Sequence, residues 1–209
     1  MIRREVDGAL WTLVLDRPEK ANSLTRAMLG ELLGHLIEAK GAAKAVILTG
    51  AGRVFSAGAD LEEARAGLAT DPVWEALSAQ LAGMPCLTIA ALNGTLAGGA
   101  FGMALACDIR LAVPGARFFY PVMKLGYLPQ PSDPGRLVAL VGPGRARVLL
   151  MGGARIEAEE ALAWGLVDRL CPPEALLDAA RDLAADACVA PEGHAGRIKA
   201  MIPRTWSQG

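Results

Sequence analysis

Hydrophobic positions along the chain alternate between short unbroken runs and longer stretches with helical spacing. The runs at 45–48 (AVIL) and 86–92 (CLTIAAL) are almost wholly apolar, as expected for strands that are buried on both faces. Similar runs predict further strands at 9–15, 109–113 and 116–119. Turn residues such as Asp-Arg-Pro and Asn-Gly follow several of these runs.

Helices are predicted where apolar residues recur three or four positions apart. Residues 24–39 show this spacing, and Ser23 or Thr25 is expected to cap the helix. Further helices are predicted to begin near Ala59 and around Gly98-Gly99, and to occupy 135–141, 144–151, 158–164 and 174–187. The weakly periodic tail after Val189 predicts a short helix against another subunit or a frayed end.

The two patterns alternate without a linker, which predicts a single α/β domain over 1–209, with about 170–209 as a helical oligomerisation tail. Apolar residue types make up 53% of the chain, and this favours burial between subunits. Residues 76–107 carry no charge, but Pro85, Asn93 and the glycines around Gly98 interrupt them. We therefore interpret this stretch as helix end, strand and turn, and predict no membrane span.

Composition excludes several other classes of protein. The net charge is -1 with no basic tract, so nucleic acid is not an expected partner. The N-terminus lacks the apolar core of a signal peptide, and a cytoplasmic protein is expected. The four cysteines lack C-x-x-C spacing, which predicts buried reduced thiols and no metal site.

Common catalytic motifs are also missing. The segment after Thr49 begins G-x-G but has Phe55 where a dinucleotide fold needs its third glycine. No phosphate-binding G-x-x-x-x-G-K-[ST] and no G-x-S-x-G occurs. His35 on a predicted helix and His194 in the tail are expected to be solvated, which leaves little support for a Ser-His-Asp triad.

Two turns of small residues are the strongest chemical signal. FSAGADL follows the first buried strand and NGTLAGGA follows the second, and each leads toward a helix. Such turns can aim free backbone N–H groups at a ligand, and two of them on neighbouring strands could form an oxyanion hole. The alternative is that small residues only allow strand and helix to pack closely.

The chain resembles the crotonase (enoyl-CoA hydratase/isomerase) superfamily in five blocks that keep the family's order. LDRPEKANSL from Leu15 is similar to L-x-R-P-E-K-x-N-A-L, and VILTGAGRVFSAGADL from Val46 is similar to V-L-T-G-x-G-x-x-F-x-A-G-A-D-L. The block that begins at Ala90 resembles A-x-x-N-G-x-x-x-G-G-G-x-E-L-A-x-x-C-D-I. The last two, from Lys124 and Ala158, resemble K-L-G-L-x-P and A-x-E-A-x-x-x-G-L-V.

This resemblance implies a crotonase-like spiral of strand–strand–helix repeats with C-terminal helices, assembled as a homotrimer or hexamer. It implies an acyl-CoA thioester as substrate, with CoA entering as part of the substrate and no separate cofactor, and a role in fatty acid metabolism. The oxyanion-hole N–H groups would belong to Ala59 and Gly99. The CoA would lie near residues of the first turn and the segment before it: Ala21, Ala57, Asp60 and Leu61.

The chain departs from the family where hydratases carry their two glutamates. The resemblance places these at Gly102 and Val122, and neither residue can carry a proton. A third position, used by some isomerases and dehalogenases, holds Gln130. Asp133 and Tyr120 remain as candidates for the proton carrier. The sequence favours Asp133 as the N-cap of the following helix and Tyr120 as a core aromatic.

The sequence therefore predicts an acyl-CoA-processing lyase or isomerase that stabilises a thioester enolate. Two alternatives stay open at this point. One is an acyl-CoA-binding protein without turnover, because the glutamates are missing. The other is a decarboxylase of a malonyl-type thioester, which would need only the oxyanion hole.

Overall fold

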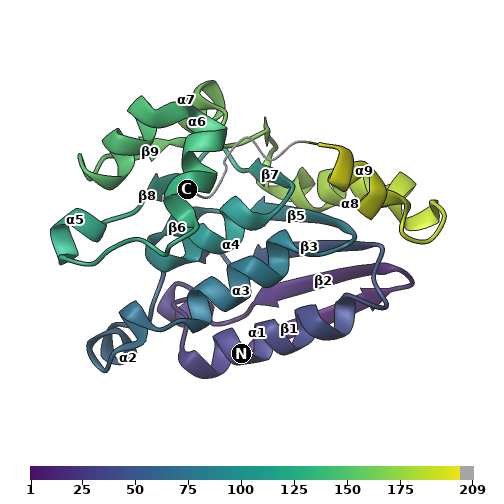
Figure 1. The fold of residues 1–209 in the computed structure, drawn as a ribbon, viewed down its shortest axis with the longest axis horizontal. Coiled ribbons are helices and arrows are strands. Elements are labelled where there is room, and N and C mark those ends of the chain that lie inside the picture. Colours follow the sequence, from purple (N-terminus) through teal and green to yellow (C-terminus); the bar gives the residue numbers. More distant parts are fainter. Residues whose placement is uncertain (203–209) are drawn as a thin grey trace.

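Two sheets form the centre of the computed structural model, which describes residues 1–202 (Figure 1). The larger sheet has six strands in the order β1-β2-β3-β5-β7-β10, and only the β1–β2 pair is antiparallel. Its strands are β1 (Ile2–Asp7), β2 (Leu10–Leu15), β3 (Ala45–Gly50), β5 (Leu87–Leu92), β7 (Ile109–Ala112) and β10 (Arg169–Leu170).

The smaller sheet has four short strands in the order β4-β6-β8-β9. They are β4 (Val54–Ser56), β6 (Thr95–Ala97), β8 (Arg117–Phe119) and β9 (Arg155–Glu157). Three times the chain passes from a long strand of the first sheet to a short strand of the second: β3 to β4, β5 to β6 and β7 to β8. A helix follows each pair, so the expected spiral of strand–strand–helix units is confirmed.

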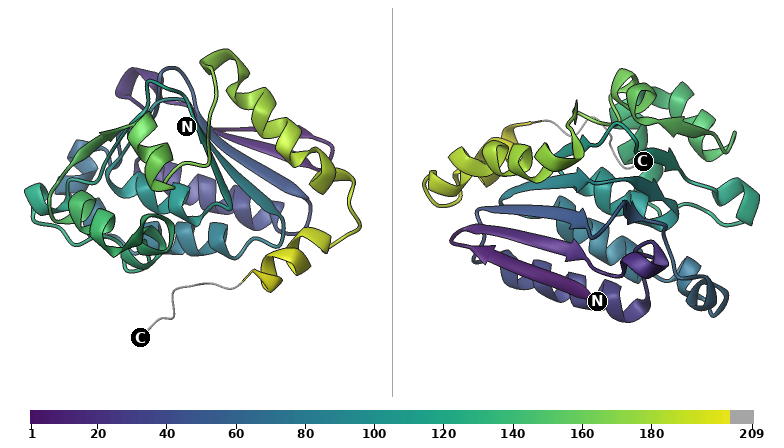
Figure 2. Two further views of the ribbon diagram at one scale, coloured as in Figure 1. Left: turned by 90° about the horizontal axis from the view of Figure 1, so that it is seen from above. Right: turned by 180° about the vertical axis from the view of Figure 1, so that it is seen from behind.

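Helices cover the sheets and complete the chain. In Figure 2 (right) the strands of the six-stranded sheet lie in front of α1 and α3. The α-helices are α1 (Arg26–Ala39), α2 (Leu61–Arg65), α3 (Val73–Ala82), α4 (Phe101–Ala106), α5 (Val122–Leu125), α6 (Asp133–Leu150), α7 (Ala158–Trp164), α8 (Leu176–Val189) and α9 (His194–Met201). Short 3₁₀ turns are η1 (Pro18–Lys20), η2 (Leu68–Thr70), η3 (Gly98–Ala100) and η4 (Pro173–Ala175).

Helix α1 shows how the apolar pattern becomes packing. Its buried side chains recur on one face, which lies against the sheet and α3. Of the two predicted caps, the structure selects Thr25, whose side-chain oxygen accepts a hydrogen bond from Met28 N at 3.2 Å. Strand β3 is buried at all positions except Gly50, as its apolar sequence predicted.

The predicted break between helices at 135–141 and 144–151 is confirmed, because α6 is interrupted at Gly142 (φ 79°, ψ 163°), although the first helix begins earlier, at Asp133. Other element predictions need correction. Strand β1 was not predicted because it is a polar edge strand, exposed at every residue except Ile2. The tail forms α8, which contacts β3 and β5, and α9, while residues 203–209 lie outside the described part. Within the described residues, no helix is long and apolar enough to cross a membrane.

Two asparagines hold the corner where β3 passes into β4. Asn22 is fully buried, and its Oδ1 accepts a hydrogen bond from Arg17 N at 2.9 Å. Its Nδ2 donates to Ala51 O at 2.9 Å and to Val54 O at 2.7 Å. Asn93 binds the same corner from β5, because its Oδ1 accepts from the backbone N–H of Gly50 at 3.0 Å. These bonds fix the start of the first small-residue turn.

We predict that Asn22→Ala destabilises the protein by about 3 kcal/mol, because three hydrogen bonds are lost and buried backbone groups are left unpaired. Urea unfolding measures the difference. Glu19→Ala is the control, since Glu19 lies in the neighbouring turn but is exposed, and it should change stability by less than about 0.5 kcal/mol. Equal stability of the two variants would contradict this role of Asn22.

Candidate active site

The two small-residue turns lie directly against each other. Gly58, after β4, has a φ of +92°, a backbone conformation that side chains other than glycine rarely adopt. A Cβ atom added to Gly58 would lie 2.9 Å from Ala97 O and 3.3 Å from Gly98 Cα. The β4 turn can therefore touch the β6 turn only because it has glycine at this position.

Ala59 comes directly after Gly58 in the first turn, and Gly99 comes directly after Gly98 in the second. Their backbone N–H groups are the two predicted donors. Asp60, next to Ala59, donates its N–H to Leu24 O at 2.8 Å. Gly99 lies in the first turn of η3, where an N–H has no acceptor within the helix. Outside the regular elements of residues 1–202, neither Ala59 N nor Gly99 N donates a described hydrogen bond.

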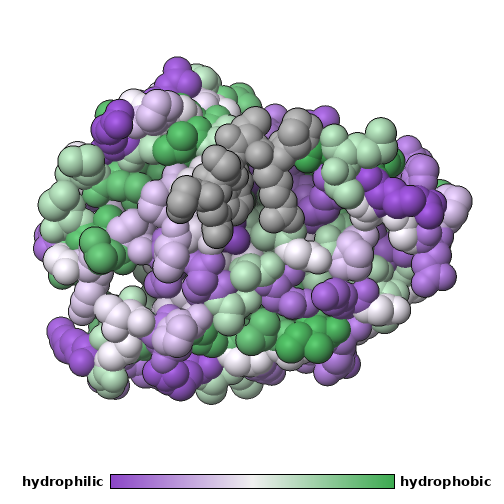
Figure 3. All heavy atoms as spheres, viewed as in Figure 1, coloured by the Kyte–Doolittle hydropathy of each residue, from purple (hydrophilic) through white to green (hydrophobic). Residues whose placement is uncertain are grey.

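A cavity of about 230 Å³ opens beside both turns. In Figure 3 the surface is hollowed on the left, between the lobe of α2 below and the lobe of α5 above. Elements from across the chain contribute to its walls, which include Ala59, Gly99, Trp74, Tyr120, Val122 and Gln130.

Tyr120 lines this cavity, and the carboxyl group of Asp133 lies behind it. Its hydroxyl donates to Asp133 Oδ2 at 2.9 Å and accepts from Gln130 N at 3.4 Å. Its ring stacks on Phe101, with centroids 5.4 Å apart. Asp133 is completely buried and is not among the lining residues, so Tyr120 stands between the carboxyl group and the cavity.

The interpretation of Asp133 as a helix cap is wrong. The N-cap position of α6 is Ser132, and no side-chain cap bond is formed there. Asp133 is the first residue of the helix, and its carboxylate points to Tyr120 instead of to the free N–H groups of the first turn. The interpretation of Tyr120 as a core aromatic is right about burial but incomplete, because the ring also faces the cavity.

Gly102 explains where the Asp133 carboxylate lies. A Cβ atom added to Gly102 would be 2.9 Å from Asp133 Oδ1 and 3.3 Å from Oδ2. The carboxylate therefore occupies the space into which a side chain at position 102 would extend. Any larger residue at 102 and an aspartate at 133 compete for the same volume.

A second cavity of about 450 Å³ adjoins the first and shares Ala57, Ala59 and Leu61 with it. Three basic residues contribute to its lining: Arg17, Lys20 and Arg65. Ala21, predicted near the CoA, does not line it, but its carbonyl oxygen accepts a hydrogen bond from Ala57 N at 3.0 Å.

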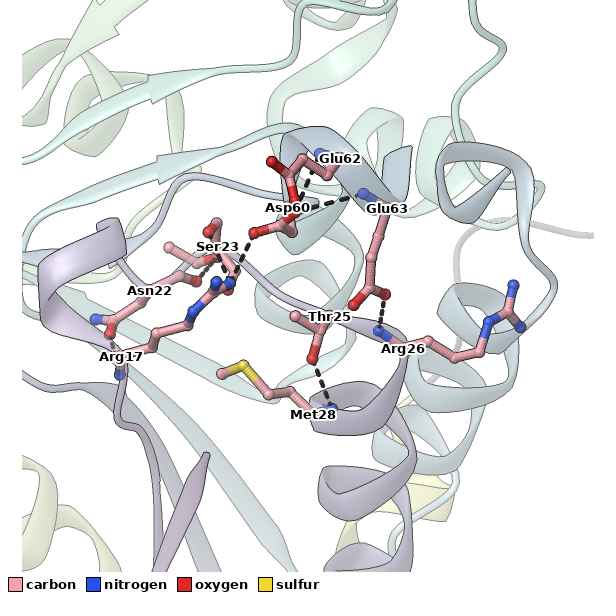
Figure 4. A network of polar contacts seen from close by, with 10 residues as sticks. Arg17, Asn22, Ser23, Thr25, Arg26, Met28, Asp60, Glu62 and Glu63 are labelled. Atoms are coloured by element: carbon pink, nitrogen blue, oxygen red, sulfur yellow. Dashed lines mark hydrogen bonds and ion pairs between the residues drawn. The ribbon is translucent and has the colours of Figure 1, made fainter. Parts of the chain in front are cut away.

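Asp60 connects this cavity to the polar network in Figure 4. Its carboxylate accepts from Arg17 Nη1 at 2.8 Å and from the backbone N–H groups of Glu62 (3.1 Å) and Glu63 (3.4 Å). The Arg17 hydrogen bond, together with those N–H groups, lowers the pKa of Asp60. Asp60 therefore caps α2 as an anion and holds the Arg17 side chain at the edge of the cavity.

Comparisons with known proteins agree with this geometry. Residues 5–208 match the profile of the enoyl-CoA hydratase/isomerase family. The chain belongs to this family. It is 38% identical over 184 residues to a carnitinyl-CoA dehydratase of Citrobacter koseri, covering 85% of this chain and 70% of the relative. It is 32% identical over 212 residues to the 1,2-epoxyphenylacetyl-CoA isomerase of Escherichia coli, covering 96% and 81%.

A solved structure of an enoyl-CoA hydratase-like protein from Thermobifida fusca in complex with CoA is also similar. It superposes with a TM-score of 0.87 and 30% identity over 96% of this chain and 83% of that one. The fold is therefore that of the crotonase superfamily, as the sequence resemblance implied.

The charged groups around Asp133 lie on two helices of this crotonase fold, α3 and α6. Burial raises the pKa of Asp133 to about 7, against the opposing effects of the Tyr120 hydrogen bond and of the Arg136 guanidinium at 3.9 Å. The negative charge of Glu75 on α3 raises it further. Burial, with the nearby carboxylate second, also raises the pKa of Tyr120. Asp133 can consequently gain or lose a proton near neutral pH, whereas Tyr120 stays protonated.

Helix α3 supplies residues that the sequence did not single out. Glu75 accepts hydrogen bonds from Ser132 N at 3.1 Å and from the Ser132 hydroxyl, and so holds the start of α6. Trp74, the preceding residue, lines the cavity and packs beside Gly99. The only sequence signal was a large aromatic beside an acid at the start of a helix, which is a common arrangement in a solvated helix.

We predict that Asp133→Asn stabilises the protein increasingly as pH rises. The pKa of Asp133 is higher in the folded state than its ordinary value of 3.8, so its contribution to stability is full below about pH 4 and is lost as pH rises through about 7. Asparagine keeps an acceptor for Tyr120 but never ionises. Its advantage over the wild type should grow by up to about 4 kcal/mol between pH 4 and pH 8.

Urea unfolding at several pH values measures this difference. Asp182→Asn, which makes the same chemical change at an exposed position on α8, is the matched control. If Asp133→Asn behaved like this control, the buried carboxyl group would not have the proton affinity assigned to it.

Proposed function

We propose that the protein is an acyl-CoA isomerase that moves one proton through a thioester enolate. The observation that carries this proposal is the Tyr120–Asp133 pair, which places one proton-carrying unit on the wall of the cavity beside Ala59 and Gly99. Membership of the family, whose relatives include named isomerases and dehydratases of CoA thioesters, supports the choice of substrate.

The enolate would be stabilised by the N–H groups of Ala59 and Gly99. Removal of a proton from Cα leaves the electron pair delocalised onto the thioester oxygen, where negative charge develops. Two backbone donors aimed at that oxygen stabilise the enolate more than the substrate. The contact between the two turns at Gly58 and Gly98 supports this assignment, because Ala59 and Gly99, the residues that follow, both line one cavity.

The Tyr120–Asp133 pair would carry the proton. With Asp133 ionised, the Tyr120 hydroxyl donates to it and offers its own oxygen to the cavity. The substrate Cα–H bond breaks, its proton goes to the Tyr120 oxygen, and the hydroxyl proton passes to Asp133. Reversal of these transfers at another carbon of the enolate restores the pair and completes an isomerisation. A pKa of about 7 suits a group that must accept and return a proton near neutral pH.

Hydration of a double bond fits the site less well. It needs a second acid or base to activate water, and the positions implied by the family resemblance hold Gly102 and Val122. No carboxylate side chain lines this cavity among the described residues.

A protein that only binds acyl-CoA is also disfavoured. Asp133 Oδ1 accepts no described hydrogen bond and has only the longer ion pair to Arg136 Nη1 at 3.9 Å, and burial of a carboxylate with so few partners lowers stability without benefit to binding alone.

We predict that Tyr120→Phe and Asp133→Asn each lower proton exchange at Cα by about 100-fold or more, because each removes one half of the relay. The test follows deuterium uptake from D₂O into enoyl- and saturated acyl-CoA thioesters by mass spectrometry. Tyr127→Phe removes the hydroxyl of the other tyrosine on the cavity wall and should leave the rate within about threefold. Undiminished exchange in Tyr120→Phe would rule out the relay.

A further inference from the structure

We infer that the acyl group accepted by this site is uncharged and carries a ring, with Trp74 as the residue that selects it. This inference rests on the proposed function for one point only, the placement of the thioester oxygen near Ala59 and Gly99. The size, walls and charge of the cavity then define what lies beyond the thioester.

The cavity has the volume of a ring with a short linker. An apolar cavity of about 150 Å³ is large enough to bind benzene, and the volume here is about 230 Å³. The additional space corresponds to the few carbon atoms between a thioester and a ring. A short acyl group such as acetyl would leave most of this volume unfilled, at a cost in lost contacts.

Aromatic rings form two of the walls. The Trp74 indole lies 3.3 Å from the position that a Cβ atom at Gly99 would take, so its face packs beside the proposed oxyanion donor. Its Nε1 donates to Leu68 O at 2.9 Å, which fixes the orientation of the ring and satisfies its polar edge. The Tyr120 ring is held by its stack on Phe101. Fixed aromatic walls favour a rigid ring in stacked or edge-to-face contact.

The lack of charged side chains in the described cavity wall excludes acyl groups that carry a free carboxylate. No charged side chain is among the described residues that line this cavity. The basic side chains of Arg17, Lys20 and Arg65 line the adjoining cavity instead. An acyl carboxylate would therefore be buried without a cation to pair with among the described residues of the cavity wall. This argues against malonyl-type substrates, and with them the decarboxylase alternative.

The rim of the cavity is apolar as well. Leu61 on α2 and Leu125 and Leu128 on the α5 side line it, and they are exposed to 73%, 58% and 86%. Hydrophobic residues appear in green on the α5 lobe at the left of Figure 3. A substituent on the ring that extends out of the cavity would therefore meet further apolar surface.

Binding of CoA thioesters measured by titration calorimetry tests this inference. The ligands are phenylacetyl-CoA, hexanoyl-CoA, succinyl-CoA and CoA itself. We expect phenylacetyl-CoA to bind about 10-fold or more tightly than CoA, since burial of a ring removes apolar surface from water. Hexanoyl-CoA should bind more weakly than phenylacetyl-CoA because its chain loses rotational freedom. Succinyl-CoA should bind no more tightly than CoA.

Variants assign the preference to Trp74. Trp74→Leu should abolish the advantage of phenylacetyl-CoA over hexanoyl-CoA, and Trp74→Phe, which keeps an aromatic face, should retain part of it. Trp164→Leu is the matched control, because Trp164 on α7 lies outside the cavity and should leave both affinities unchanged.

The outcomes separate this inference from the proposed function. The expected order of affinities without any deuterium exchange would support the ring-bearing substrate and overturn the isomerase. Exchange with hexanoyl-CoA, combined with no preference for phenylacetyl-CoA, would support the isomerase and overturn the inference. Tight binding of succinyl-CoA would overturn the inference directly.

Discussion

A buried carboxylate that takes the place of a missing side chain is the constraint on which the site depends. Asp133 lies in the space that a residue larger than glycine at 102 would fill, and its hydrogen bond to Tyr120 directs the hydroxyl away from bulk solvent. Burial without a full set of hydrogen bonds is unfavourable for a carboxylate, and the raised pKa is the consequence. The same burial gives the group a proton affinity that is useful near neutral pH.

The spiral fold brings this pair to the two turns. Each turn follows a short strand of the smaller sheet, and β4 and β6 are parallel neighbours, so the turns emerge side by side. Helix α3 then links the parts, because Trp74 packs beside Gly99 while Glu75 holds Ser132 at the start of α6. One helix thereby positions the proposed proton carrier, the proposed oxyanion turn at Gly99 and part of the cavity wall.

Sequence patterns predicted the helices and strands that depend mainly on residues within the element itself. Buried strands such as β3 and β5, and the α1 helix with its Thr25 cap, follow from periodicity and capping alone. The position of Asp133 does not, because Asp-Pro at a helix start has the pattern of a cap whichever way its carboxylate points. What turns it toward Tyr120 is the absence of a side chain at Gly102, a contact between distant segments that only the folded chain brings together. The same reason explains why Trp74 and Glu75 carried no recognisable signal.

A double-mutant cycle on positions 102 and 133 tests the central claim most directly, with deuterium exchange at Cα as the measurement. Asp133→Gly removes the carboxylate, and Gly102→Glu forces a second acid into the space that Asp133 already fills, so each single variant should lose exchange by about 100-fold. The double variant again has one carboxylate in that space, and the account predicts recovery to within about 10-fold of the wild type. Losses that simply multiply in the double variant would contradict the claim that Asp133 stands in for the side chain missing at Gly102.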